Sequence, residues 1–151
     1  MRLGAQGEDM QLTFAVAGNP VPKARPRVYG RRTITEPRTL QYEALVRRSA
    51  ALAKRNVAWP LDGRYQVVIV VHRESEVRCD LDNVAKAILD AANGVLWNDD
   101  HQVDDLRALR GRVDRECPRA EIYVRVLDEF ALEYELTDLR RDQNGRRAGG
   151  P

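Results

Sequence analysis

The sequence predicts one α+β domain in which a small mixed or antiparallel sheet packs with two main helices. Short apolar runs with strand periodicity lie early, centrally and late in the chain, and two amphipathic segments separate them. The 151 residues, 43% hydrophobic and 32% charged, suit a single globular core. No apolar run approaches the roughly 20 residues of a membrane-spanning helix, and the first ten residues lack a signal-peptide core. We therefore expect a cytoplasmic protein without a membrane partner.

The first half of the chain is predicted to contain a strand, a hairpin and a long helix. Apolar residues alternate along Gln11–Ala17, which predicts a strand, and residues 28–34 are predicted to be its hairpin partner, turning near Gly30. A helix is expected over residues 37–55, because its first residue is a proline, which the first helical turn tolerates. The apolar face expected for this helix consists of Tyr42, Leu45, Val46, Ser49, Leu52 and Ala53.

The second half is predicted to contain a central strand, a helix and two further strands. Arg64–His72 is apolar on both sides, which predicts a strand in the middle of a sheet. Residues 83–93 show helical periodicity, and Gly94 is a plausible stop signal. Residues 103–113 are expected to form a strand despite poor alternation, and residues 120–127 alternate cleanly.

These elements define one domain over residues 11–127. Residues 1–10 are expected to form a flexible N-terminus, and residues 128–151, which are rich in charge, a disordered C-terminal tail. Two cysteines, Cys79 and Cys117, are too few to staple a fold of this size, so we expect two free thiols.

The charge of the chain is unevenly distributed. The segment GNPVPKARPRVYGRRTIT, residues 18–35, carries five basic residues and no acidic one, and its three prolines exclude a regular helix. A stiff, extended run of cations with one tyrosine suits a phosphate backbone, although a solvated loop is the alternative. The five basic residues expected to contact an anionic partner are Lys23, Arg25, Arg27, Arg31 and Arg32.

Two aspartates one residue apart, Asp80 and Asp82, precede the second predicted helix. In an extended chain their side chains point to the same side, with Cα atoms ~6–7 Å apart, and they repel one another unless a cation lies between them. Asp82 is alternatively a natural N-cap for the helix. Lys86 lies one helical turn after Asp82 and reaches the same site; alternatively it forms an exposed ion pair with Asp82 or Asp90.

A second acidic pair, Asp99 and Asp100, follows the helix, and a returning chain would bring one of them beside Asp80. Three carboxylates and a lysine form a set of groups suited to Mg²⁺ or Mn²⁺. Such a site lowers the pKa of a bound water and polarises a phosphodiester, while the lysine stabilises the growing negative charge. A calcium-binding EF-hand is excluded, because the glycine and the downstream glutamate of that loop are missing.

The run DLDNVAKAILDAANGVLWNDDHQV resembles the signature of the RusA-type endonucleases, the Holliday-junction resolvases of bacteria and their phages. The family pattern opens with D-L-D-N at residues 80–83, places a lysine at Lys86 and closes with D-D-x-Q-V at residues 99–103. The upstream GNPVPKARPRV is similar to the proline- and arginine-rich N-terminal stretch of the family. The resemblance covers about residues 18–103 and implies a RusA-like α+β fold.

The resemblance also implies a function. It predicts a metal-dependent, structure-selective DNA endonuclease, a homodimer that cuts two opposed strands of a four-way junction with Mg²⁺ or Mn²⁺. The implied catalytic residues are Asp80, Asp82, Lys86 and Asp100, the metal ligands are Asp80, Asp82 and Asp100, with Asp99 as the alternative, and the DNA-binding residues are Lys23, Arg25, Arg27, Arg31 and Arg32. The rival hypothesis is a non-catalytic protein that binds branched DNA or RNA and uses the aspartates structurally.

Overall fold

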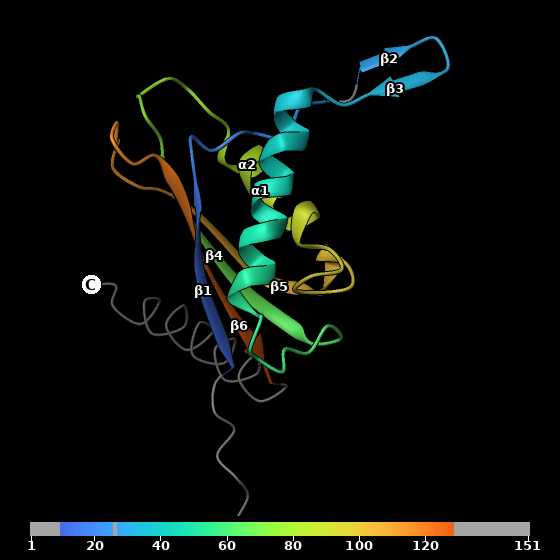
Figure 1. The fold of residues 1–151 in the computed structure, drawn as a ribbon, viewed down its shortest axis with the longest axis vertical. Helices are drawn as coiled ribbons and strands as arrows, with labels where there is room; N and C mark the ends of the chain where they lie inside the picture. The colour runs from blue at the N-terminus through green and yellow to red at the C-terminus, as the bar shows by residue number, and fades with distance from the viewer. Residues whose placement is uncertain (1–9, 26, 129–151) are drawn as a thin grey trace, which may run out of the picture.

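The computed structural model describes residues 10–25 and 27–128, which form a four-stranded sheet, a separate two-stranded hairpin and two α-helices (Figure 1). The strands are β1 (Gln11–Ala17), β2 (Arg27–Tyr29), β3 (Arg32–Ile34), β4 (Arg64–His72), β5 (Val103–Arg110) and β6 (Arg119–Leu127). The helices are α1 (Pro37–Ala53), α2 (Leu81–Ala92) and the short 3₁₀ helix η1 (Asp100–Gln102). This arrangement confirms the predicted α+β class. Apart from Met10 and Asp128, the predicted flexible N-terminus and C-terminal tail lie outside the described residues.

The sheet has the strand order β1-β6-β4-β5 and is mixed, because β4 runs antiparallel to β6 and parallel to β5. The prediction that β4 is a central strand is confirmed. Its residues Tyr65, Val67 and Ile69 are fully buried on one face, and the residues between them are half-buried on the other. The parallel pairing with β5 requires a crossover, and α2 supplies it.

The predicted pairing of β1 with the hairpin is wrong. β1 pairs with β6, placing Phe14 opposite Ile122, whereas β2 and β3 pair only with each other and turn at Gly30, whose φ of 60° suits glycine. Every residue of β2 and β3 is exposed, so the hairpin has no apolar face to bury against the sheet. It projects beyond the N-terminal end of α1 (Figure 1).

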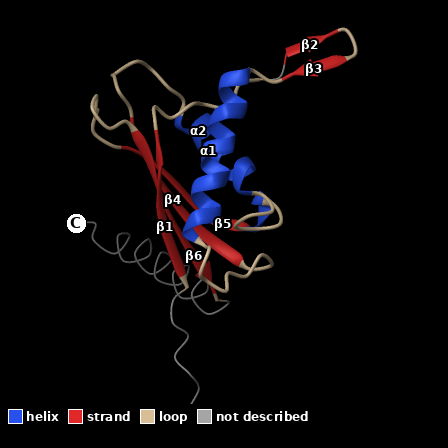
Figure 2. Cartoon of the chain, in the orientation of Figure 1, coloured by secondary structure: helices blue, strands red, loops and turns tan. Residues whose placement is uncertain are grey.

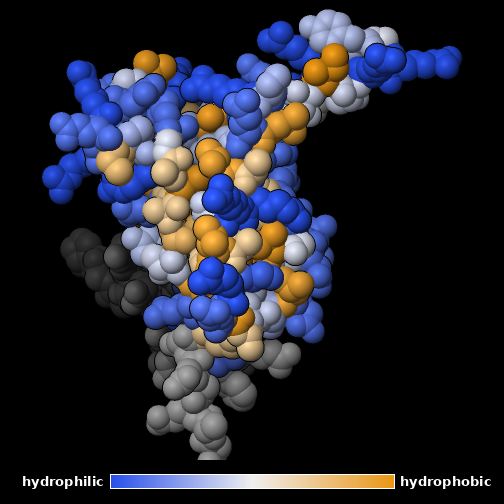
Figure 3. All heavy atoms as spheres, in the orientation of Figure 1, coloured by the Kyte–Doolittle hydropathy of each residue, from blue (hydrophilic) through white to orange (hydrophobic). Residues whose placement is uncertain are grey.

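Both helices pack on the same face of the sheet (Figure 2). The predicted apolar face of α1 is partly wrong, since Leu45 and Leu52 are 47% and 57% exposed. The small residues Thr39 and Ala50 are buried instead, one turn before Tyr42 and one turn after Val46. Small side chains allow the helix to approach its neighbours closely on that side, and this leaves the leucines on the outer surface. Figure 3 shows the resulting apolar patches between charged residues over α1.

Two remaining predictions concern the last strands and the thiols. β5 ends at Arg110, three residues before the predicted end. Cys79 and Cys117 are both free, as expected. No helix among the described residues combines the length and apolarity needed to cross a membrane.

Candidate active site

Asp80 and Asp82 lie at the start of α2, but not in the predicted arrangement. The helix begins at Leu81, so Asp80 is the N-cap residue and Asp82 belongs to the first helical turn. The predicted extended pair, and the alternative in which Asp82 caps a helix beginning at Asn83, are therefore both wrong. The side chain of Leu81 is partly buried and packs against the core. This packing favours a helix that begins two residues earlier than predicted.

Both aspartates present exposed carboxylates. Asp80 makes no side-chain capping hydrogen bond. Within the described part of the chain, neither carboxylate forms a hydrogen bond or an ion pair. Their position at a helix N-terminus favours negative charge, because the unpaired N–H groups there carry a partial positive charge. The structure thus offers two carboxylates that are free to accept a ligand.

Lys86 connects the two halves of the predicted site. It lies on the second turn of α2, and its Nζ is 2.8 Å from Oδ2 of Asp100 on η1 and 2.9 Å from Oδ1 of Asp90. The side-chain hydrogen bonds from Lys86 to Asp100 and to Asp90 raise the pKa of Lys86 above its usual value. The predicted alternative, an ion pair with Asp90 one turn away, is also present, so Lys86 makes both contacts.

Lys23 departs from the prediction, because it does not extend freely towards a partner. Its Nζ lies 2.6 Å from Oε1 of Glu43 and 3.0 Å from Oδ2 of Asp90, and its main-chain N–H donates to the carbonyl of Asn83. Burial works to raise the pKa of Asp90, but hydrogen bonds from Lys86 and Lys23 outweigh it and lower that pKa. Lys23, Asp90, Lys86 and Asp100 therefore form a chain of alternating charges that joins the basic segment to η1.

Asp99 and Asp100 have different surroundings. Asp99 is the N-cap of η1, and its exposed carboxylate accepts a hydrogen bond from the main-chain N–H of His101 at 3.0 Å. That hydrogen bond, with a second one from the His101 ring, lowers the pKa of Asp99. Asp100 instead meets Lys86. The contacts of this loop therefore favour Asp100 over Asp99 as the member that belongs with Lys86.

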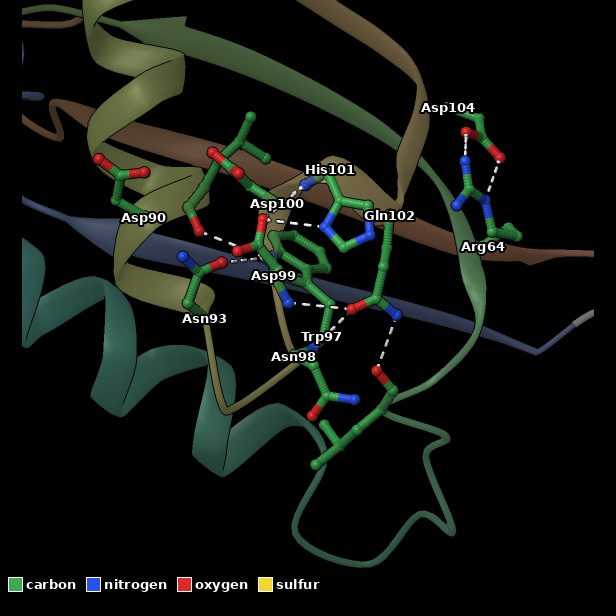
Figure 4. Close-up of polar contacts among 12 residues, drawn as sticks. Arg64, Asp90, Asn93, Trp97, Asn98, Asp99, Asp100, His101, Gln102 and Asp104 are labelled. Carbon is green, nitrogen blue, oxygen red and sulfur yellow. Dashed lines mark hydrogen bonds and ion pairs between the residues drawn. The ribbon is translucent and has the colours of Figure 1, made fainter.

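Gln102 holds this loop in place, a role that the sequence analysis missed. Its Oε1 accepts hydrogen bonds from the N–H groups of Asn98 and Asp99 at 2.9 Å (Figure 4). Its Nε2 donates to the carbonyls of Leu61 and Gly63, also at 2.9 Å. Gln102 is only 6% exposed, so this amide replaces water for four main-chain groups. The D-x-x-Q spacing of a capping box was the available sequence signal.

Aromatic packing anchors the chain that returns from α2. Gly94, with φ of 74°, turns the chain, and Trp97 is then fully buried against Tyr65, with ring centroids 5.6 Å apart. The Trp97 indole N–H donates to Oδ1 of Asn93 at 2.9 Å, and Trp59 also stacks on Tyr65, with ring centroids 5.9 Å apart. Asp100 thus lies three residues after the buried Trp97, and this anchored segment brings it back to α2.

The described residues contain no group of three or more His, Cys, Asp or Glu side chains placed closely enough to hold a metal ion. Asp80 and Asp82 begin α2, whereas Asp100 is occupied by Lys86. The donor chemistry still fits Mg²⁺, because this ion is commonly bound by one or two carboxylates together with waters and substrate phosphates. The free carboxylates of Asp80 and Asp82 are of that kind.

The other predicted basic residues are placed differently from Lys23. Arg27, Arg31 and Arg32 lie on the projecting hairpin and Arg25 precedes it, and all four are exposed. None of these four guanidinium groups has a hydrogen bond or an ion pair in the part of the chain that the structure describes. Tyr29, 60% exposed, lies among them. The hairpin thus presents unpaired cations and an aromatic ring to solvent.

A comparison with protein families gives a match that covers most of the chain. Residues 17–125, most of the chain, match the family described as Endodeoxyribonuclease RusA. The matched region begins at the last residue of β1 and contains the hairpin, both α-helices, η1 and most of β6. A comparison with curated proteins finds no match. The match includes Asp80, Asp82, Lys86 and Asp100, and it confirms the family that the sequence resembles: this chain belongs to the RusA family of endodeoxyribonucleases.

Proposed function

We propose that the protein is a metal-dependent DNA endonuclease that resolves four-way junctions by paired, symmetric hydrolysis of two phosphodiester bonds. The main support for this proposal is the hydrogen bond between Lys86 and Asp100, which are fourteen residues apart in the chain. This bond brings the two parts of the sequence motif together. Membership of an endodeoxyribonuclease family supports the hydrolytic activity in general. The junction, the metal and the paired cuts are the parts that experiments must test.

We infer that Asp80, Asp82 and Asp100 hold Mg²⁺, with Mn²⁺ as a substitute. The bound ion would lower the pKa of a water molecule and polarise the phosphodiester. Lys86 would place its ammonium group next to the reacting phosphate, where a positioned cation stabilises negative charge that develops in the transition state. Asp90, which also contacts Lys86, limits the directions in which that side chain can point.

Branched DNA suits the projecting hairpin. Its arginines have no hydrogen bond or ion pair within the described residues and stand apart from the sheet, so they can follow a phosphate backbone away from the aspartates of α2. Contacts of this kind position a duplex without reading its sequence. Recognition of a junction would then depend mainly on the shape of the DNA and on its backbone.

A homodimer would supply two equivalent active sites for the two equivalent phosphates of a junction. The exposed leucines of α1, Leu40, Leu45 and Leu52, provide apolar surface for such an interface, since each is about half exposed. Leu45 and Leu52 are seven residues apart and so share one side of the helix.

The test is cleavage of a synthetic four-way junction with Mg²⁺, beside a linear duplex of the same sequences, by the wild type and by Asp82→Asn. Paired symmetric nicks in the junction alone, lost in the variant while binding persists, are the expected result. Binding without cleavage by either protein, with Mg²⁺ and with Mn²⁺, would favour the alternative of a non-catalytic branched-DNA- or RNA-binding protein. The observation in favour of that alternative is that the described carboxylates form no three-residue cluster.

A further inference from the structure

A groove of about 500 Å³ lies beside the start of α2, and Asp80 lines it. One wall is the proline-rich segment at Pro22 and Lys23, and the others are the beginning of α1 and the loop that ends at Asp80. No residue predicted from the sequence to bind DNA lies in this groove except Lys23, whose side chain is already engaged by Glu43 and Asp90. The other two basic residues that line the groove are Arg38 and Arg78.

Two arginines line the groove without a protein partner. Arg38 is the second residue of α1, and Arg78 lies two residues before Asp80; both are exposed. Over residues 10–25 and 27–128, neither guanidinium group donates a hydrogen bond or forms an ion pair. Two other arginines near this end of the sheet are occupied: Arg110 donates to the carbonyl of Cys79 at 2.6 Å, and Arg119 pairs with Asp114.

One wall of the groove is held in place by several contacts, and the two helix N-termini beside it favour a bound anion. Lys23 fixes the proline-rich segment by its main-chain bond to Asn83 and by its two ion pairs, so that wall is held in position. Both α-helices begin at the groove, and the N-terminal end of a helix carries partial positive charge. Glu36 and Asp80 are the acidic side chains of the groove, so its anion-binding capacity depends on Arg38 and Arg78.

We propose that Arg38 and Arg78 bind phosphates of the DNA strand that is cut, next to the phosphate that reacts at Asp80. The groove is then the channel for the scissile strand, whereas the hairpin contacts DNA farther away. A guanidinium group presents a planar fork of donors that matches two phosphate oxygens, which a flexible ammonium group does not. This inference rests on the proposed endonuclease function, because it assigns Asp80 to the cutting site.

The experiment measures binding of a fluorescent four-way junction with Ca²⁺ in place of Mg²⁺, so that cleavage does not interfere, across a range of salt concentrations. Arg38→Gln and Arg78→Gln are each expected to weaken binding about tenfold, which is the size expected for one charged hydrogen bond. Each should also reduce the slope of log affinity against log salt by about one, because one phosphate contact is lost. Arg38→Lys should keep the slope but recover only part of the affinity.

Arg48→Gln and Arg55→Gln are the matched controls. These arginines are also exposed and lack partners among the described residues, but they lie in the second half of α1 and just after it, outside the groove. They should bind the junction nearly as tightly as the wild type. Thermal unfolding of the four glutamine variants and of Arg38→Lys should match that of the wild type, since each replaces an exposed side chain.

The outcomes separate this inference from the proposed function. If the wild type cleaves junctions but Arg38→Gln and Arg78→Gln bind with unchanged affinity and salt slope, the groove does not bind the strand and only this inference is overturned. Equal losses in the control variants would likewise overturn it, because general electrostatic attraction would then explain the binding. If the wild type binds but never cleaves, the endonuclease proposal fails, while selective losses in the two groove variants still establish phosphate binding there.

Discussion

Gln102 is buried between η1 and the loop before β4, where its amide satisfies four main-chain groups. Gln102→Leu keeps a similar volume but removes the partner that Gln102 provides for the Asp99 N–H and for the Gly63 carbonyl, whereas the Asn98 N–H still donates to the carbonyl of Leu61. We expect this change to reduce the free energy of unfolding by about 2–4 kcal/mol, because buried polar groups that lose their hydrogen bonds are costly. Urea unfolding followed by circular dichroism would measure it.

The control for Gln102 is Gln41→Leu on the exposed side of α1, which should change stability by less than about 0.5 kcal/mol. If both variants were equally stable, the four hydrogen bonds would not be what holds the Asp99–Asp100 loop. A further consequence is catalytic, because Asp100 is the first residue of η1 and Gln102 is its last. Gln102→Leu should therefore also lower the rate of junction cleavage at a temperature at which it remains folded.

Asp90 makes a pH-dependent contribution to stability. Its pKa is lower in the folded protein than in the unfolded chain, so its ion pairs contribute fully above the unfolded pKa of about 3.9 and are lost as the pH falls through the folded value. The wild type should therefore lose more stability than Asp90→Asn when the pH is lowered from about 5 to about 3. Urea unfolding of both proteins at each pH measures the difference.

Other carboxylates also have lowered pKa values, such as Asp104 beside Arg64. Their contributions to the pH dependence of stability are the same in the wild type and in Asp90→Asn, so they cancel in the comparison. Asp62→Asn is a suitable control, because Asp62 is exposed and forms no ion pair among the described residues. A difference between wild type and Asp90→Asn that did not depend on pH would show that the ion pairs with Lys23 and Lys86 do not stabilise the fold.

At the scale of elements, the β2–β3 hairpin is separate from the core. Substituting glutamine at its three arginines, Arg27, Arg31 and Arg32, should leave thermal stability unchanged, since all three are exposed. The same triple variant should bind junction DNA more weakly, with a salt slope reduced by about three, because three phosphate contacts are lost. Fluorescence anisotropy titrations at several salt concentrations measure both quantities.

The double variant Arg48→Gln and Arg55→Gln serves as the comparison for the hairpin, since it removes charge from a different surface. An unchanged salt slope in the hairpin variant would mean that the hairpin does not contact the DNA backbone. The exposed Tyr29 at its tip would then need another role.

The crossover from β4 through α2 to β5 is the element that assembles the site. β4 is central and rigid, α2 begins with the two free aspartates, and the return through Trp97 brings Asp100 back to Lys86. Each part depends on a buried contact with the sheet or the core. The polar residues of the site are therefore placed by apolar residues that take no part in the chemistry.

At the scale of the whole molecule, paired cleavage requires two copies. Leu45→Glu with Leu52→Glu should convert a dimer into a monomer without loss of monomer stability, because both leucines are exposed in the single chain. Analytical ultracentrifugation at micromolar concentration measures the change, and the variant should produce single rather than paired nicks. A wild type that sediments only as a monomer would contradict the paired mechanism itself, whichever surface is involved.

Local patterns in the sequence determined much of this protein. The alternation of apolar residues placed β1 at its observed bounds, and a continuous apolar run did the same for β4. A proline and a glycine marked the start of α1 and the turn after α2. The D-L-D-N and D-D-x-Q-V runs identified the family before any contact was known. These features depend on residues close together in the chain, so their physical cause is visible in a short window.

Tertiary structure decided what depends on residues far apart in the chain. It paired β1 with β6 rather than with the hairpin, and it buried Ala50 rather than Leu45 on α1. It also placed the start of α2 at Leu81, whose partly buried side chain packs against the core, and this made Asp80 the N-cap. The sequence predicted that the returning chain would bring Asp99 or Asp100 beside Asp80. The contact of Lys86 with Asp100 depends on the buried return at Trp97, which places η1 beside α2.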